Sequence, residues 1–248
     1  MNSTSSLQRL AVLLYGLVCY LVFFATFLYL IAFVGGYFVP RSLDSAPVRP
    51  LGIAFAINTV LVLIFGLQHS VMARPVFKRW ITSVIPPAAE RSTYVLASSL
   101  ALMVLFRFWQ PMGGVVWAVQ NALGRGVLLA GFALGWLTVL GTTLLINHFD
   151  LFGLRQVWKF FRGVDYVPIK FVTPGPYKHV RHPLYVGFLL AFWCAPTMTV
   201  AHLVFALLNT AYILTAIRFE ERDLATHLGQ DYVDYQNRTP MLVPRVGK

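Results

Sequence analysis

Long apolar runs separated by short polar segments make up most of the chain, a pattern typical of proteins that cross a membrane several times. Four of these runs are near the roughly 20 residues that a helix needs to cross a bilayer. They cover residues 10–39, 51–73, 91–109 and 123–147. The sequence therefore predicts four membrane-spanning helices in these ranges.

A fifth apolar run, residues 184–217, differs from the others because it contains Pro196 near its middle. It is too long for one straight crossing and too short for two full ones. Proline interrupts the hydrogen bonding of a helix, so we expect a helical hairpin that turns near residues 194–199. The polar segments 148–183 and 218–248 are expected to form a cytoplasmic region.

The composition agrees with a protein embedded in a membrane. Hydrophobic residues make up 58% of the 248 residues and charged residues 12%, against about 45–50% and about 25% in soluble proteins. These values exclude a soluble globule, a disordered chain and a disulfide scaffold. We expect residues 1–248 to form a single all-α integral membrane domain. Cys19 and Cys194 lie alone in apolar runs, so neither a disulfide nor a metal site is expected.

The basic residues of the chain are placed at the ends of the apolar runs. The chain has 20 Lys and Arg against 9 Asp and Glu, a net charge of +11. Its basic residues stand at the ends of the runs without interleaved aromatics, so the lipid bilayer, and not a nucleic acid, is the expected partner. Because cytoplasmic loops are rich in Lys and Arg, residues 74–91 and 148–183 and both termini are expected in the cytoplasm.

Candidate binding chemistry concentrates at the two ends of the predicted hairpin. Prolines and glycines between Thr173 and Pro183 indicate a rigid turn, and Pro183 suits the first turn of a helix. If the hairpin folds back, Glu220 and Glu221 at its other end lie beside this turn. A helix N-terminus and cationic groups would bind a carboxylate, and the glutamates would bind an ammonium group or ribose hydroxyls. This is the ligand profile of an amino-acid nucleoside.

One motif in this region resembles a known cofactor signature. Arg181-His182-Pro183-x-Tyr185-x-Gly187 followed by Glu220-Glu221 resembles the S-adenosylmethionine signature of the isoprenylcysteine carboxyl methyltransferase and phospholipid methyltransferase group of membrane enzymes. The tail Gly229-x-Asp231-Tyr232-x-x-Tyr235, ending in Val243-Pro244, resembles the tail of that group. The resemblance implies S-adenosyl-L-methionine as the cofactor, bound by Tyr177, His179, Arg181, His182, Pro183, Tyr185, Gly187, Glu220, Glu221 and Tyr232.

Three other stretches narrow the resemblance to one branch. Residues 68–72, 90–94 and 147–157 resemble the bacterial methanethiol S-methyltransferases, which make dimethyl sulfide. The branch implies a bacterial inner-membrane enzyme that methylates a small thiol and needs no metal, because a sulfonium already carries an activated methyl group. Since a thiolate is the real nucleophile, a base or a cationic environment is expected. The candidate bases are His148, paired with Asp150, and His69, and the candidate cations are Arg91 and Arg155.

Other interpretations of the same residues stay open at this point. His182 can cap a helix, Tyr185 can anchor at the membrane interface, and the glutamate pair can be a solvated helix end. The acceptor could instead be a lipid or prenyl-cysteine carboxylate, which would favour a wide lipid-facing opening. A third alternative is a non-enzymatic membrane protein similar to NnrU, against which the intact glutamate pair weighs. The oligomeric state is not indicated.

Overall fold

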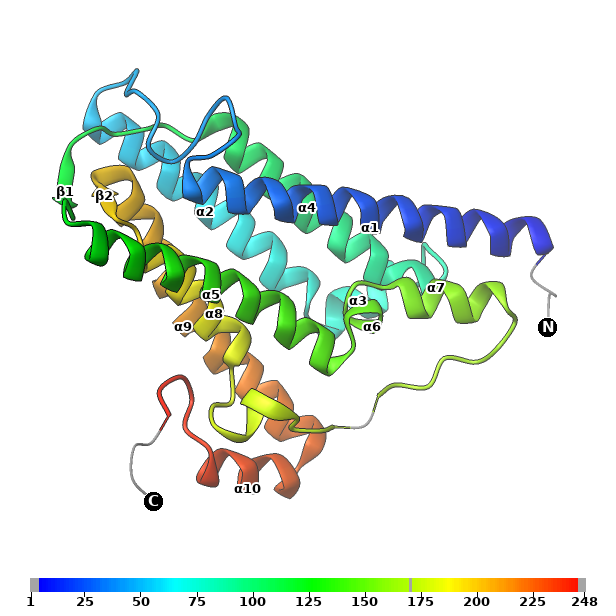
Figure 1. The fold of residues 1–248 in the computed structure, drawn as a ribbon. Helices are drawn as coiled ribbons and strands as arrows, with labels where there is room; N and C mark the ends of the chain where they lie inside the picture. The colour runs from blue at the N-terminus through cyan, green and yellow to red at the C-terminus, as the bar shows by residue number, and fades with distance from the viewer. Residues whose placement is uncertain (1–4, 170, 245–248) are drawn as a thin grey trace. The chain divides into compact units, whose positions relative to one another are not determined.

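The computed structural model describes residues 5–169 and 171–244. These residues form helices and one short two-stranded ribbon, which confirms the all-α membrane fold (Figure 1). They divide into two compact units. Unit 1 comprises residues 5–42, 56–109 and 147–169, and unit 2 comprises residues 43–55, 110–146 and 171–244. The two termini, expected in the cytoplasm, lie outside the described residues.

Unit 1 is built around the first helix of the chain. Its elements are α1 (Ser6–Gly35), α2 (Leu51–Met72, from residue 56 onward), α3 (Pro75–Ile81), the 3-10 turn η1 (Pro87–Ala89), α4 (Glu90–Phe108), α6 (His148–Leu151) and α7 (Leu154–Phe161). Both α4 and α7 pack against α1. The contact with α7 requires Gly16, because a β-carbon there would lie 2.6 Å from a methyl group of the buried Val157.

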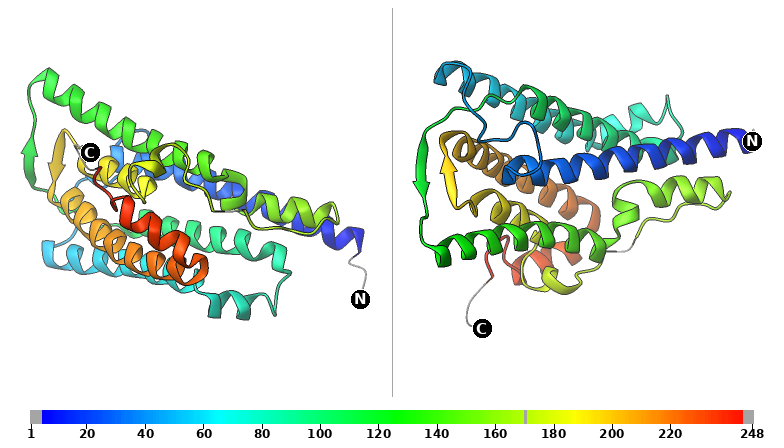
Figure 2. Two further views of the ribbon diagram at one scale, coloured as in Figure 1. Left: turned by 90° about the horizontal axis from the view of Figure 1, so that it is seen from below. Right: turned by 45° about the horizontal axis from the view of Figure 1, so that its top comes forward.

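Unit 2 contains the predicted hairpin. Its elements are β1 (Val115–Ala118), α5 (Ala122–Ile146), the 3-10 turn η2 (Gly175–Lys178), α8 (Pro183–Trp193), β2 (Thr197–Thr199), α9 (Val200–Leu228) and α10 (Gln230–Arg238). Strands β1 and β2 pair antiparallel. The views in Figure 2 place this ribbon at one end of α5 and α9 and place α10 near the opposite end of α9. The region that carries the candidate binding chemistry is therefore far from the ribbon.

The hairpin turns where the sequence predicts it. Helix α8 ends at Trp193 and α9 begins at Val200. Thr199 caps the N-terminus of α9, because its hydroxyl accepts a hydrogen bond from the His202 N–H at 3.1 Å. The Trp193 indole N–H donates to the Thr210 hydroxyl at 3.0 Å and joins the two arms. Helix α9 then continues to Leu228, so residues 218–228, which we expected in the polar tail, form the last turns of a long helix.

Four helices in the described residues are long and apolar enough to cross a membrane, but they are not the four that we predicted. They are α1, α2, α5 and α9. The third predicted span is helical, as α4, but it is not among them. It begins with Glu90 and Arg91, ends beside Arg107 and carries several hydroxyl side chains, which lower its hydropathy. The first span ends at Gly35 rather than residue 39, because Gly36 adopts a left-handed φ of 73°.

Helices α5 and α8 approach each other closely through two glycines. A β-carbon on Gly187 would lie 2.8 Å from the Gly135 carbonyl oxygen and 2.9 Å from the Val139 nitrogen, and one on Gly135 would lie 2.6 Å from the Ala191 nitrogen. Small residues are a general means of packing helices in membranes, where lipid tails leave little hydrophobic driving force between them. The position of α8 against α5 therefore depends on this glycine pair.

We expect Gly187→Ala to lower the thermal unfolding midpoint of the detergent-solubilised protein. The added methyl group meets backbone atoms that cannot move aside, and such overpacking costs about 1–3 kcal/mol. Gly141→Ala in α5 is the matched control. Apart from its chain neighbours and the backbone of its own helix, no atom lies within 4 Å of the added β-carbon, so helix propensity predicts a gain of about 0.5–1 kcal/mol. Equal midpoints for the two variants would contradict the proposed packing.

Candidate active site

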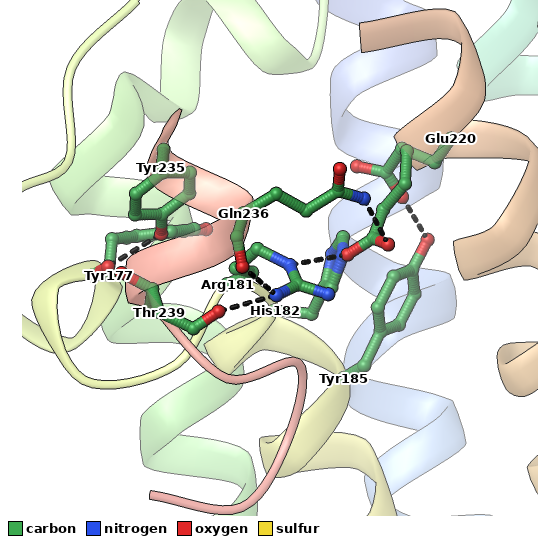
Figure 3. Close-up of polar contacts among 9 residues, drawn as sticks. Tyr177, Arg181, His182, Tyr185, Glu220, Tyr235, Gln236 and Thr239 are labelled. Carbon is green, nitrogen blue, oxygen red and sulfur yellow. Dashed lines mark hydrogen bonds and ion pairs between the residues drawn. The ribbon is translucent and has the colours of Figure 1, made fainter. Parts of the chain in front are cut away.

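The two ends of the hairpin meet at the carboxylate of Glu221 in α9. The Arg181 Nε donates to Glu221 Oε1 at 2.6 Å, and the His182 Nε2 is hydrogen-bonded to the same oxygen at 3.0 Å. The Gln236 side-chain amide, from α10, donates to Glu221 Oε2 at 2.9 Å (Figure 3). The expectation that the acidic pair lies beside the turn before α8 is thus confirmed.

The turn itself is held by the C-terminal end of the chain. The backbone N–H groups of Arg181 and His182 donate to the carbonyl oxygens of Pro240 and Met241, at 2.9 and 3.2 Å. The Arg181 Nη1 also donates to the Gln236 carbonyl at 2.9 Å and to the Thr239 carbonyl (Figure 3). One guanidinium therefore joins the end of α10 to the carboxylate on α9.

The other glutamate of the pair has different surroundings. Glu220 is exposed, and its Oε2 accepts a hydrogen bond from the Tyr185 hydroxyl at 2.8 Å (Figure 3). The Glu221 side chain, by contrast, is 12% exposed. Of the two neighbouring carboxylates, Glu220 is the one that solvent or a ligand can reach.

Two tyrosines near this pair keep their protons at neutral pH. Burial, and then the charge of Glu220, raises the pKa of Tyr177. Burial, and then the charge of Glu221, raises the pKa of Tyr232, whose ring lies edge-on to Phe171 and Tyr235 at centroid distances of 5.9 Å. Both hydroxyls therefore stay protonated and able to donate a hydrogen bond.

The remaining residues of the predicted cofactor set lie around this centre. The Tyr177 carbonyl accepts a hydrogen bond from the Tyr235 hydroxyl at 2.5 Å. His179 is exposed just after η2, and Pro183 is buried as the first residue of α8. Gly187 is close to the backbone of α5 rather than to the glutamates, so its missing side chain serves helix packing.

In unit 1, His69 belongs to a polar network between α2 and α4. The Ser98 hydroxyl donates to the Tyr94 carbonyl at 3.0 Å, so its oxygen is the acceptor for His69 Nδ1 at 3.1 Å. His69 Nε2 then carries the lone pair that accepts the Tyr94 hydroxyl at 2.6 Å. The network therefore indicates the Nδ1-protonated tautomer, with Tyr94 as the donor to the ring.

His148, also in unit 1, is buried among aromatic rings. Its Nε2 is hydrogen-bonded to the Tyr20 hydroxyl at 2.9 Å, and its ring packs against Phe149 and Phe152. Burial lowers the pKa of His148, so the ring is neutral at pH 7 and able to accept a proton.

The remaining candidates, Asp150, Arg155 and Arg91, form hydrogen bonds around α6 and α7. The Asp150 carboxylate accepts hydrogen bonds from Arg155 Nη1 at 2.9 Å and from the Tyr166 hydroxyl at 3.0 Å. It thus orients the Arg155 guanidinium, whereas we expected it to orient the imidazole of His148. The Arg91 Nε donates to the Leu151 carbonyl at 2.9 Å, and this guanidinium also lies over the Tyr94 ring.

Sequence reasoning missed several partners of these residues. Gln236, Thr239, Tyr94, Tyr20 and Tyr166 complete the networks. Tyr94 stands in a stretch that carries the resemblance, which was a usable signal. The others are common residue types in polar or apolar segments, and no spacing distinguishes them.

Comparison with known proteins adds to this geometry. The isoprenylcysteine carboxyl methyltransferase (ICMT) family matches residues 137–226. The methanethiol S-methyltransferase of Crocosphaera subtropica is 53% identical over 246 residues, which cover 99% of this chain and 96% of the relative. The chain belongs to the methanethiol S-methyltransferase family.

Two further family members are similar over most of their length. Methanethiol S-methyltransferase 2 of Bradyrhizobium diazoefficiens is 52% identical, covering 96% of this chain and 92% of the relative. The methanethiol S-methyltransferase of Mycobacterium tuberculosis is 50% identical, covering 96% and 98%. No solved structure matches the chain.

We expect Arg181→Lys to loosen the end of α10. A lysine ammonium keeps the charge opposite Glu221, but it lacks the fork of N–H donors that reaches two carbonyls as well. Losing one charge-assisted hydrogen bond, worth about 1.5–3 kcal/mol, corresponds to roughly ten- to hundredfold faster cleavage of residues 229–244 in limited proteolysis. Arg222→Lys, on an exposed side chain of the same region, is the control. Identical cleavage rates for both variants would exclude this role of Arg181.

Proposed function

We propose that this chain transfers a methyl group from S-adenosyl-L-methionine to methanethiol and releases dimethyl sulfide. The observation that carries the proposal is the 53% identity to a methanethiol S-methyltransferase across nearly the whole of both chains. In the reaction a carbon–sulfur bond of the sulfonium breaks, a carbon–sulfur bond to the acceptor forms, and the thiol loses its proton.

The polar centre of unit 2 supports the assignment of the donor site to the hairpin ends. The exposed Glu220 carboxylate and the Tyr185 hydroxyl offer polar contacts for an ammonium group or ribose hydroxyls. The exposed Phe171 ring and the half-buried Tyr235 ring, which both pack on the buried Tyr232, offer apolar faces of the kind that a purine ring packs against. When bound, S-adenosylmethionine supplies the activated methyl group, and the task of these residues is to hold and orient it.

The acceptor requires a group that takes its proton, since simple thiols are mostly protonated at neutral pH. We assign this role to one of the two histidines of unit 1. His148 is neutral because burial lowers its pKa, and His69 Nε2 has its lone pair directed to the Tyr94 hydroxyl. Either ring is thereby prepared to accept a proton, directly or through a hydroxyl. The Arg91 and Arg155 guanidinium groups would favour the thiolate.

The chain is a multi-pass membrane protein, and we place the hairpin ends on the cytoplasmic side of a bacterial inner membrane. Helices α1, α2, α5 and α9 are each able to span the bilayer. The segment that precedes α8 contains Lys178 and Arg181, and the end of α9 contains Arg218 and Arg222. The preference of cytoplasmic loops for Lys and Arg supports this orientation, which also gives the site access to a water-soluble donor.

Membranes that contain the chain are expected to release dimethyl sulfide when given S-adenosylmethionine and methanethiol, as measured by headspace gas chromatography. His182→Ala should weaken the binding of S-adenosylmethionine about ten- to hundredfold, because the ring holds the Glu221 carboxylate of the candidate site and a hydrogen bond to a charged group is worth about 1.5–3 kcal/mol.

Methyl transfer from radiolabelled donor to lipids or to a prenyl-cysteine carboxylate is the control. Labelled lipid or prenyl-cysteine ester without dimethyl sulfide would overturn the assignment of the acceptor. Absence of donor binding by the parent would overturn the function as a whole.

If His148 is the base, the turnover of the parent should rise with pH through the lowered pKa of the ring, because only the neutral form accepts a proton. His148→Ala should be slow at neutral pH and partly recover at higher pH, where more of the thiol ionises without help. Dimethyl sulfide release across pH measures this, with exposed Asp165→Asn as the control. Full activity of His148→Ala at neutral pH would leave His69 as the base.

A further inference from the structure

The two carboxylates of the Glu220-Glu221 pair are engaged to very different degrees. A carboxylate has about four lone-pair sites. Three of those on Glu221 are occupied by donors from Arg181, His182 and Gln236, at 2.6, 3.0 and 2.9 Å. Glu220 is an exposed residue, and its Oε2 accepts a hydrogen bond from the Tyr185 hydroxyl at 2.8 Å (Figure 3).

The charge of Glu221 is also compensated within the protein. The guanidinium of Arg181 lies against it with 11% of its side chain exposed, and the ring of His182 is 5% exposed. A ligand cation brought to Glu221 would have to displace one of these partners. Because a buried ion pair that loses one member leaves the other charge uncompensated, such an exchange is costly.

The partners of Glu221 come from three different segments of unit 2. Arg181 and His182 belong to the turn before α8, Gln236 belongs to α10, and Glu221 itself belongs to α9. Arg181 extends the connection through the carbonyls of Gln236 and Thr239. The contacts of Glu221 therefore fix the walls of the candidate donor site relative to one another.

We infer a division of labour within the acidic pair: Glu220, held by the Tyr185 hydroxyl, binds the cationic amino group of the donor's amino-acid part, while Glu221, Arg181 and Gln236 are positioning residues that do not contact the donor. The inference rests on the proposed function, and it assigns a role to Gln236, which lies outside the sequence motif. Neutralising either glutamate should weaken donor binding. For Glu220 the cause is loss of a contact with the amino group, and for Glu221 it is displacement of the surrounding segments, so ligands with and without the amino-acid part distinguish the two.

The test compares S-adenosylhomocysteine with methylthioadenosine, which has the same nucleoside and thioether but no amino-acid part. Binding of both is measured by calorimetry on the full chain in detergent, together with the unfolding midpoint. Glu220→Gln should weaken S-adenosylhomocysteine about tenfold or more, leave methylthioadenosine unchanged and leave the midpoint unchanged. Tyr185→Phe, which removes only the hydroxyl that holds Glu220, should show the same selectivity with a smaller loss.

Glu221→Gln and Gln236→Leu should behave differently, because they displace a wall of the site instead of removing a contact. Both should weaken the two ligands by the same factor, lower the unfolding midpoint and speed cleavage of residues 229–244. Gln236→Glu places a second carboxylate beside Glu221. It should therefore cause a larger loss of affinity, a larger drop in the unfolding midpoint and faster cleavage than Gln236→Leu.

Three results would overturn the division of labour. They are an equal loss of both ligands in Glu220→Gln, no loss in that variant, or a loss confined to S-adenosylhomocysteine in Glu221→Gln with an unchanged midpoint. A parent that binds neither ligand would instead refute the proposed function on which the inference rests.

Discussion

The candidate donor site depends on the hydrogen bonds and the ion pair that the half-buried carboxylate of Glu221 forms. Its hydrogen bonds with Arg181, His182 and Gln236 connect residues that lie 15 to 40 positions away in the sequence. A charge removed from water must be paired and hydrogen-bonded, or it destabilises the fold. Because this carboxylate needs partners from several segments, its contacts bring together the turn before α8, the last turns of α9, and α10.

The position of the site further depends on how closely two helices pack. Gly135 and Gly187 let the backbones of α5 and α8 approach to a distance that no side chain would permit. Since α8 begins directly after Arg181 and His182, any shift of this helix along α5 would move the residues that hold Glu221. Helix packing and site geometry are thus parts of one arrangement within unit 2.

The two histidines of unit 1 differ from Glu221 because their partners are hydroxyl groups, although Asp150 and Arg155 of the same unit form an ion pair. His69 is bonded to Tyr94 and Ser98, and His148 is bonded to Tyr20. Neutral rings with neutral partners avoid the cost of a charge in an apolar interior, yet they retain the capacity to accept a proton. This suits a reaction in which a thiol must lose its proton while the charge of a sulfonium is neutralised.

The sequence by itself determined the fold class, the hairpin and the meeting of the turn before α8 with the glutamate pair, because hydropathy, proline placement and the motif around His182 are local signals. It did not determine where every helix ends. Helix α1 ends at Gly35 instead of residue 39 and α9 extends to Leu228, so a window of apolar residues does not fix the end of a helix.

Only the tertiary structure decided which atoms each site residue contacts. In the sequence Glu220 and Glu221 are neighbours of the same residue type and cannot be distinguished, but successive residues of a helix point in directions about 100° apart. One carboxylate therefore turns toward Arg181 and Gln236, and the other turns toward Tyr185 and solvent. The partners Gln236, Tyr94 and Tyr20 could not be chosen in advance, because a hydrogen bond between distant segments depends on packing that no local pattern encodes.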